Sequence, residues 1–302
     1  MRASRSPTAL SDAFTRLPGT ARGAIWMLGA SLFFGTHGVW VRFAVEEGAD
    51  PLVISFWRSL VLLLLILPWI IANRRTALRS AHPTGQLLRV AFSMIGLILL
   101  VTAQANLPLA EVSALTFAAP LFGMMGAALF LGEAVRARRW VATLVGFVGV
   151  WIVLRPGVSE VNPLFALPLI SALFIAGSNL MIRFLSKDDA PTTTVAWLAM
   201  GSVPFTLVPA LFAWAWPTPM ALFWMAMLGA AGLGAHICLV RAFTAAEASA
   251  VLSYDYSRLI VTSTLGFFIF AEVPTIWTWV GGAVIVGAVV YIARQERRAG
   301  DA

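Results

Sequence analysis

Asp255 and Arg258 carry the clearest chemical signal in this sequence, because they stand three positions apart within an otherwise apolar stretch. At that spacing two side chains share one face of a helix and can form an ion pair. Such a pair either neutralises its own charges inside a membrane, or it binds a substrate or carries a proton. We favour the functional interpretation because Tyr254 and Tyr256, two of only three tyrosines in the chain, flank Asp255 with hydroxyls and flat rings.

Arg58 is another charged residue inside an apolar stretch, at 52–71, and it stands beside Trp57. Its guanidinium could reach the membrane surface with its stem along the helix, or it could hold a substrate carboxylate or phosphate through two parallel hydrogen bonds. Both interpretations stay open from the sequence. Trp57 also matches Trp197 in the second half of the chain, so the two rings could form a stacking wall for an aromatic or cationic substrate.

Four further polar residues complete the candidate site: His37, His236, Gln104 and Asn179. In membrane helices such side chains more often hydrogen-bond to a neighbouring helix than relay protons, but each could also line a cavity. The two histidines are far apart in the sequence, and the single cysteine, Cys238, adds no ligand spacing. We therefore expect no metal site and no cofactor.

The elements that must position these residues are membrane helices. Of 302 residues, 60% are hydrophobic and only 12% are charged, whereas a soluble domain carries about 25% charged residues. A helix needs roughly 20 apolar residues to cross a bilayer, so the sequence predicts an all-α integral membrane protein with ten transmembrane helices. The predicted spans are 23–41, 52–71, 89–107, 112–132, 140–154, 164–182, 194–214, 221–240, 248–271 and 276–293.

The distribution of charge predicts the orientation of the chain. Most of the 21 lysines and arginines fall in the tails and in alternate loops, on the side that is expected to face the cytoplasm. We therefore expect a multi-pass protein of the plasma (inner) membrane with both termini cytoplasmic, residues 1–22 as a disordered tail and residues 296–302 as a C-terminal tail. The net charge of +7 does not indicate nucleic-acid binding, because no segment outside the membrane is large enough for a basic patch.

The sequence contains an internal repeat. The motif at Ala110–Leu115 recurs as Ala246–Val251, and the first half, residues 23–155, aligns helix for helix with the second, residues 163–295. Because each half has an odd number of helices, the second half enters the membrane from the opposite side. Inverted halves of this kind are typical of transporters, since exchanging their conformations opens a central site to alternate sides of the membrane.

The repeated motifs resemble those of the EamA domain, the unit of the drug/metabolite transporter superfamily. The motifs that carry the resemblance are Leu107–Glu111, Ala119–Leu121, Leu131–Glu133, Ser253–Leu259 and Phe270–Pro274. The last two are similar to a variant that reads Pro-Phe-Asp-Tyr-x-Arg-Leu and Phe-Gly-Glu-x-Pro, with Ser253-Tyr254 here in place of Pro-Phe. Glu133 and Glu272, at the ends of the predicted fourth and ninth helices, are interpreted as anchors of helix ends.

The resemblance implies two inverted five-helix EamA repeats around a central cavity that binds a small molecule. Members of this superfamily move amino acids, nucleotide-related compounds, riboflavin, S-adenosylmethionine, amines and xenobiotics, mostly as exporters. We expect a secondary-active transporter of a small metabolite (amino acid, vitamin or amine-like), working by alternating access, with export favoured over import. We lean towards a zwitterionic or aromatic substrate.

The sequence has no phosphate-binding loop for ATP, so a gradient would drive transport, with protons as a possible coupling ion and Asp255 as the candidate carrier. We expect a monomer or weak homodimer embedded in the bilayer. A structural or regulatory membrane subunit is the alternative. A membrane-embedded enzyme is a weaker one, because the polar residues are dispersed along the sequence, and we expect no enzymatic activity.

Overall fold

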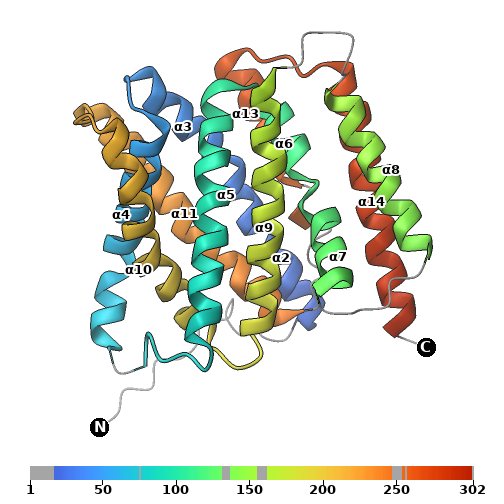
Figure 1. Cartoon of the computed structure of the whole chain (residues 1–302), viewed down its shortest axis with the longest axis horizontal. Helices are drawn as coiled ribbons and strands as arrows, with labels where there is room; N and C mark the ends of the chain where they lie inside the picture. Colours follow the sequence, from blue (N-terminus) through green and yellow to red (C-terminus); the bar gives the residue numbers. More distant parts are fainter. Residues whose placement is uncertain are drawn as a thin grey trace.

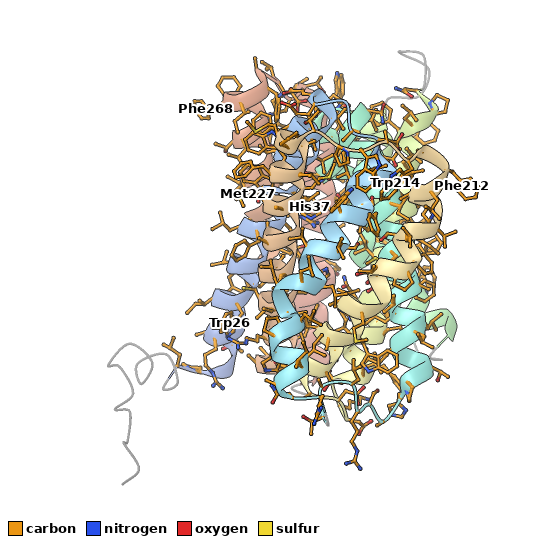
Figure 2. The ribbon with its side chains drawn as sticks, turned by 90° about the vertical axis from the view of Figure 1, so that its left-hand side faces the viewer. Trp26, His37, Phe212, Trp214, Met227 and Phe268 are labelled. Carbon is orange, nitrogen blue, oxygen red and sulfur yellow. The ribbon has the colours of Figure 1, made fainter. Side chains whose placement is uncertain are left out.

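The computed structural model describes residues 17–74, 76–130, 137–154, 162–246, 254–255 and 257–300, and these residues form helices and connections without any strand. Within them, six helices are long and apolar enough to cross a membrane, judged by length and composition. Shorter apolar helices accompany them. Large side chains such as Phe212 and Phe268 are strongly exposed and lie at the margin of the bundle (Figure 2), as expected for a surface in contact with lipid. The prediction of an all-helical membrane protein is confirmed for this part of the chain.

The first half of the chain builds a series of helices with prolines at several of their starts. Pro51 and Pro83 occupy first positions, where a missing N–H costs nothing, and the Asp50 carboxylate accepts a hydrogen bond from the Leu52 N–H at 2.8 Å. The helices of this half are α2 (Gly19–Gly35), α3 (His37–Glu46), α4 (Pro51–Ala72), α5 (Pro83–Asn106), α6 (Leu109–Thr116), α7 (Ala119–Phe130) and α8 (Ala137–Leu154).

The second half follows the same local rules. Pro191 and Pro219 begin two of its helices, and the Thr218 hydroxyl accepts a hydrogen bond from the Ala221 N–H at 3.1 Å. The helices of this half are η1 (Pro163–Phe165), α9 (Ala166–Leu185), α10 (Pro191–Ala210), η2 (Leu211–Ala213), α11 (Pro219–Ala245), α13 (Ser257–Phe270) and α14 (Ile276–Gly300).

The helices form a bundle in which segments from the two halves alternate (Figure 1). Helix α5 packs along α9, α2 along α11, and α4 along α10, while α8 and α14 pair at one side of the bundle. We call the end at which α2 begins and α14 ends the tail end, and the opposite end the far end. The connections α4–α5 and α9–α10 lie at the tail end, whereas α3 and the start of α6 lie towards the far end.

Two interruptions break otherwise continuous apolar helices. The span predicted at 112–132 is interrupted, because α6 ends at Thr116 before α7 begins at Ala119. The break between α2 and α3 at Thr36 was not predicted. It leaves the Gly35 carbonyl without its helical partner, and the Thr262 hydroxyl of α13 donates a hydrogen bond to that oxygen at 3.2 Å.

The structure corrects several predicted boundaries. Helix α2 begins at Gly19, inside the expected tail, and α14 continues to Gly300, through most of the expected C-terminal tail. Arg89 was placed in a cytoplasmic segment at the edge of a span, but α5 begins at Pro83, so Arg89 lies within the helix and is 0% exposed. Its Nη1 donates to the Thr194 carbonyl at 2.8 Å. The predicted spans missed the first turns of α5 because those turns are amphipathic rather than uniformly apolar.

Candidate binding cavity

The bundle encloses a cavity of about 130 Å³ between helices of both halves. Its wall is mostly apolar, with a limited number of polar groups that converge on it, which is the usual character of a small-molecule site. The lining residues are Phe34, His37, Arg58, Ser93, Met94, Leu97, Leu100, Gln104, Val112, Ser113, Thr116, Phe117, Ala119, Ile175, Ser178, Asn179, Ile182, His236, Leu239, Asp255, Arg258 and Thr262.

Most of the residues singled out from the sequence meet in this one cavity. From the first half come His37, at the start of α3, together with Arg58 of α4 and Gln104 of α5; Figure 2 shows His37 in the interior of the bundle. From the second half come Asn179, His236, Asp255 and Arg258. Residues that are as much as 221 positions apart therefore share one space, although no sequence spacing relates them.

Two candidates, Trp57 and Tyr254, do not join them. Trp57 packs against an apolar cluster with Val53 and Ile54, and its indole meets Phe56 edge-on at 5.7 Å between ring centroids. The Tyr254 side chain is 43% exposed and lies in a surface groove rather than in the cavity. Tyr256 lies outside the described residues.

Arg58 and His37 form the most deeply buried polar contact of the cavity. Nε of Arg58 donates to Nε2 of His37 at 3.1 Å, and Arg58 is only 2% exposed. The guanidinium lies against Gly232 of α11, where an added Cβ would come within 2.8 Å of its Nη2. Glycine at this position therefore makes room for Arg58, which turns inward instead of reaching the membrane surface.

Asp255 and Arg258 form the ion pair that their spacing predicts, with 3.4 Å between Oδ2 and Nη2. The Ser31 hydroxyl of α2 donates to the other carboxylate oxygen at 3.2 Å. The Arg258 guanidinium also lies over the rings of Phe34 and Phe117, at 5.9 and 5.3 Å from their centroids. The pair is thus held by the opposite half of the chain and faces two flat aromatic surfaces.

Several buried polar atoms of the cavity have no hydrogen-bond partner among the described residues. They are Nδ1 of His37, Oε1 of Gln104, Nδ1 of His236 and Nε of Arg258. Buried polar atoms are normally satisfied by protein, water or a ligand. Their convergence on one space is what a binding site for a polar small molecule requires.

At the far end of the bundle, charged side chains join the two halves of the chain. Arg42 of α3 forms an ion pair with Glu272, which follows α13. The same guanidinium donates to the Gln104 carbonyl at 3.2 Å and to the Leu107 carbonyl, while Glu272 accepts a hydrogen bond from the Leu109 N–H at 2.9 Å. Glu272 thereby caps α6, whose own preceding residue supplies no side-chain cap. We call Arg42, Glu272 and the backbone groups they hold the far-end clasp.

The end of α13 positions Glu272. The Glu272 N–H bonds to the Gly266 carbonyl at 3.1 Å, and Ala271 between them has a φ of 52°. A helix commonly ends in a left-handed residue of this kind, which is usually glycine. A Cβ on Gly266 would lie 3.2 Å from a Glu272 carboxylate oxygen, so glycine there leaves room for the carboxylate.

At the tail end, a carboxylate that accepts hydrogen bonds from neutral donors joins the two halves. Asp189, between α9 and α10, accepts hydrogen bonds from the Ser80 hydroxyl, from the Ala81 N–H at 2.8 Å and from the Gln86 amide at 2.8 Å. Burial raises the pKa of Asp189, but these hydrogen bonds outweigh burial and leave the pKa below its ordinary value of 3.8. We call Asp189 and its three donors the tail-end network.

Comparison with known proteins identifies the family. Residues 21–155 match the model of the EamA-like transporter family. The riboflavin transporter of Vibrio cholerae is 33% identical to this chain, over 92% of this chain and 94% of that protein. The chain belongs to the EamA-like transporter family. The resemblance expected from its motifs is therefore confirmed, and so is its membership of a transporter superfamily.

Two further proteins extend the comparison for this EamA-like chain. The S-adenosylmethionine uptake transporter of Rickettsia bellii is 26% identical over 82% of this chain and 84% of that protein. A solved crystal structure with 14% identity covers 92% of this chain and 99% of its own chain, with a TM-score of 0.65. The similarity to that structure shows a shared fold.

Sequence reasoning missed several residues of this EamA-like cavity. Phe34 and Phe117 supply its aromatic walls, and Ser93 and Ser178 face each other across α5 and α9 with 2.7 Å between their hydroxyl oxygens. Isolated phenylalanines and serines are common in membrane helices, so no signal in the sequence separates these from packing residues. Asp189 was also missed, because it resembles any acidic residue of a loop.

Proposed function

We propose that this protein is a secondary-active transporter that moves a small, ring-bearing metabolite across the plasma (inner) membrane by alternating access. The observation that carries the proposal is the central cavity, in which charged and polar groups from both halves converge, with contacts between the halves at each end of the bundle. Riboflavin is the first substrate to test, because the Vibrio cholerae relative is a riboflavin transporter. S-adenosylmethionine is the second.

The proposal includes ten transmembrane helices in two inverted repeats, at 23–155 and 163–295, with both termini cytoplasmic. Helix packing supports the repeat. If the halves are aligned helix for helix, the contact of α5 with α9 corresponds to that of α11 with α2, and the contact of α7 with α9 corresponds to that of α13 with α2. The pairs α4 with α10 and α8 with α14 correspond to themselves. This is the pattern that a two-fold axis in the membrane plane produces.

The size of the cavity supports a conformational cycle. A volume of about 130 Å³ is close to that of an engineered cavity of about 150 Å³ that holds benzene. A flavin has three fused rings and a polyhydroxy chain, so the bundle must open to admit one. Release of either the far-end clasp or the tail-end network would open one end while the other stays closed.

Transport by purified protein in liposomes tests the proposal. Flavin fluorescence and radiolabelled S-adenosylmethionine report net movement and exchange, with protein-free liposomes as the control. Both directions are measured, because the resemblance to the superfamily favours export whereas the Rickettsia bellii relative is named for uptake. Saturable movement of either compound is expected, and Asp255→Asn should lose any dependence on an imposed pH gradient. Failure to move either compound in both directions would count against the proposal.

A further inference from the structure

Among the described residues that line the cavity, Arg58 is a cation for which no ion pair with a carboxylate is found. Arg258 is paired with Asp255, whereas no carboxylate of the described residues forms an ion pair with Arg58. Within that part of the chain, the hydrogen bond of Arg58 goes to an imidazole, the side chain of His37. A buried charge is strongly unfavourable unless opposite charge or hydrogen-bond acceptors satisfy it. A ligand that enters the cavity would supply these acceptors to Arg58.

The contact with Arg58 determines where His37 carries its hydrogen. Nε2 of His37 accepts the hydrogen bond from Arg58, so the neutral ring must be protonated on Nδ1. That Nδ1–H is buried and makes no hydrogen bond of ordinary length among the described residues, although the Gln104 side chain lies near enough to interact with the ring, which lines the cavity. Arg58 and His37 therefore both offer N–H donors at the same cavity, and none of the ion pairs among the described residues joins a carboxylate to either of them.

We propose that Arg58 and His37 form a donor site for two adjacent hydrogen-bond acceptors of the substrate, an inference that rests on the transport function proposed above. A guanidinium matches two neighbouring acceptor atoms through parallel hydrogen bonds. The N1 and O2 atoms of a flavin present such an edge, and so does a carboxylate, as in the amino-acid portion of S-adenosylmethionine. The shared chemistry is a pair of electron-rich atoms on one edge of the molecule.

The rings around the donor site suit a flat substrate. Phe34 meets His37 and His236 edge-on, at 6.3 and 5.7 Å between ring centroids, and Arg258 lies between the faces of Phe34 and Phe117. Aromatic faces bind conjugated rings by offset stacking. The flavin edge is therefore the better match, with the pyrimidine ring at Arg58 and the hydroxyl chain free to donate to Asp255 or Gln104.

Binding of matched analogues to the purified full-length protein tests this site. Riboflavin is compared with 1-deazariboflavin, in which a C–H group replaces the N1 acceptor, and S-adenosylmethionine is compared with its decarboxylated form. The wild type should prefer the compound that keeps both acceptors by about 10-fold, the value of one hydrogen bond to a charged group. Arg58→Gln should weaken the binding of that compound by about 10- to 100-fold and abolish the preference between the two analogues.

Two variants separate recognition from structure. Arg89→Gln removes a second buried arginine, which is not among the residues that line the cavity, and it should keep the preference between analogues. Gly232→Ala keeps the charge of Arg58 but displaces its guanidinium, and it should reduce the preference. The unliganded melting temperature of Arg58→Gln should equal or exceed that of the wild type, because an uncompensated buried charge is removed.

The outcomes distinguish this inference from the function on which it rests. The donor site is overturned if Arg58→Gln keeps the wild-type preference between analogues. It is also overturned if this variant weakens the binding of both members of a pair by the same factor. Binding by the wild type without any preference overturns the donor site as well and leaves the proposed function intact. A wild type that binds none of the four compounds overturns the proposed function, and the donor site with it.

Discussion

The far-end clasp and the tail-end network both join the two halves of the chain, but they satisfy a buried carboxylate in different ways. Glu272 has a full positive charge beside it, on Arg42, and both side chains are largely buried, at 15% and 20% exposed. Asp189 has neutral donors from a loop and the first turns of a helix. One end therefore depends on two opposite charges, whereas the other depends on one charge and several neutral donors.

This difference shows that the two halves of the chain are joined by different kinds of interaction at the two ends of the bundle. Removing one partner of a buried ion pair leaves the other charge unsatisfied, which costs more than the pair contributes in net terms. Removing a carboxylate from neutral donors leaves those donors without an acceptor, which costs less per group than an unpaired buried charge. Loss of one charge should therefore destabilise the far end more than the tail end.

Replacing Glu272 with Gln should have the largest effect. Arg42 would remain in a mostly buried position without an anion, so the free energy of unfolding should fall by about 2 kcal/mol, below the value for a fully buried pair because both groups keep some exposure. Denaturant unfolding in mixed micelles measures this. The double variant with Arg42→Gln should recover part of the loss, with a coupling of about 1 kcal/mol or more. Additive losses would show that the clasp does not act as a pair.

Asp189→Asn should have a smaller effect, of about 1 to 2 kcal/mol, because the amide replaces one accepting oxygen by a donor while the partners remain neutral. The matched control is Asp188→Asn. Asp188 is next in the sequence, contacts His82 at 3.1 Å and has a 55% exposed side chain, so its loss should stay within about 0.5 kcal/mol. If the two variants lose the same free energy of unfolding, the hydrogen bonds of Asp189 do not contribute more to stability than the exposed contact of Asp188.

The pH dependence of unfolding should distinguish the tail end further. Because the folded-state pKa of Asp189 is lowered, its contribution to stability is fully present above its ordinary value of 3.8 and is lost as pH falls through the lower folded value. The difference in unfolding free energy between wild type and Asp189→Asn should be constant from pH 5 to 8 and shrink below about pH 4. A difference that changes near neutral pH would point to another group.

The smallest effect is expected at an exposed contact of the far end. The Thr218 hydroxyl donates to Glu47 at 3.2 Å, which also joins the two halves, but in solvent. Glu47→Gln should change the free energy of unfolding by no more than about 0.5 kcal/mol, since exposed polar contacts contribute little. The same unfolding assay measures it, and a loss as large as that of Glu272→Gln would remove the distinction between buried and exposed ties.

Hydropathy predicted the positions of the helices well, because burial in lipid requires continuous apolar stretches. The stretch predicted at 52–71 corresponds to α4 (Pro51–Ala72), and the one at 164–182 to η1 and most of α9 (Ala166–Leu185). Hydropathy could not predict the break at Thr36, since no proline marks it and its stability depends on a hydroxyl of α13. Local sequence therefore determines the helices, while distant partners determine their interruptions.

The candidate site was predictable in its residue types but not in its pairings. Rare charges in apolar stretches identified Asp255, Arg258 and Arg58, because each needs a reason to be there. The contact of Arg58 with His37 joins two helices and has no periodic signature. Glu272 was interpreted as an anchor of a helix end, which agrees with its position after α13, but its partner Arg42 lies 230 positions earlier and was assigned to no role.

The backbone conformation of Ala271 affects the stability of the turn at the far end. Its left-handed backbone, with a φ of 52°, is a conformation that glycine adopts without strain and alanine adopts at a cost of about 1 kcal/mol. That strain is present while α13 ends in the turn that holds Glu272, and it is released when the turn relaxes. A factor of about five in population corresponds to 1 kcal/mol. The turn that holds Glu272 is therefore less populated with alanine at this position than it would be with glycine.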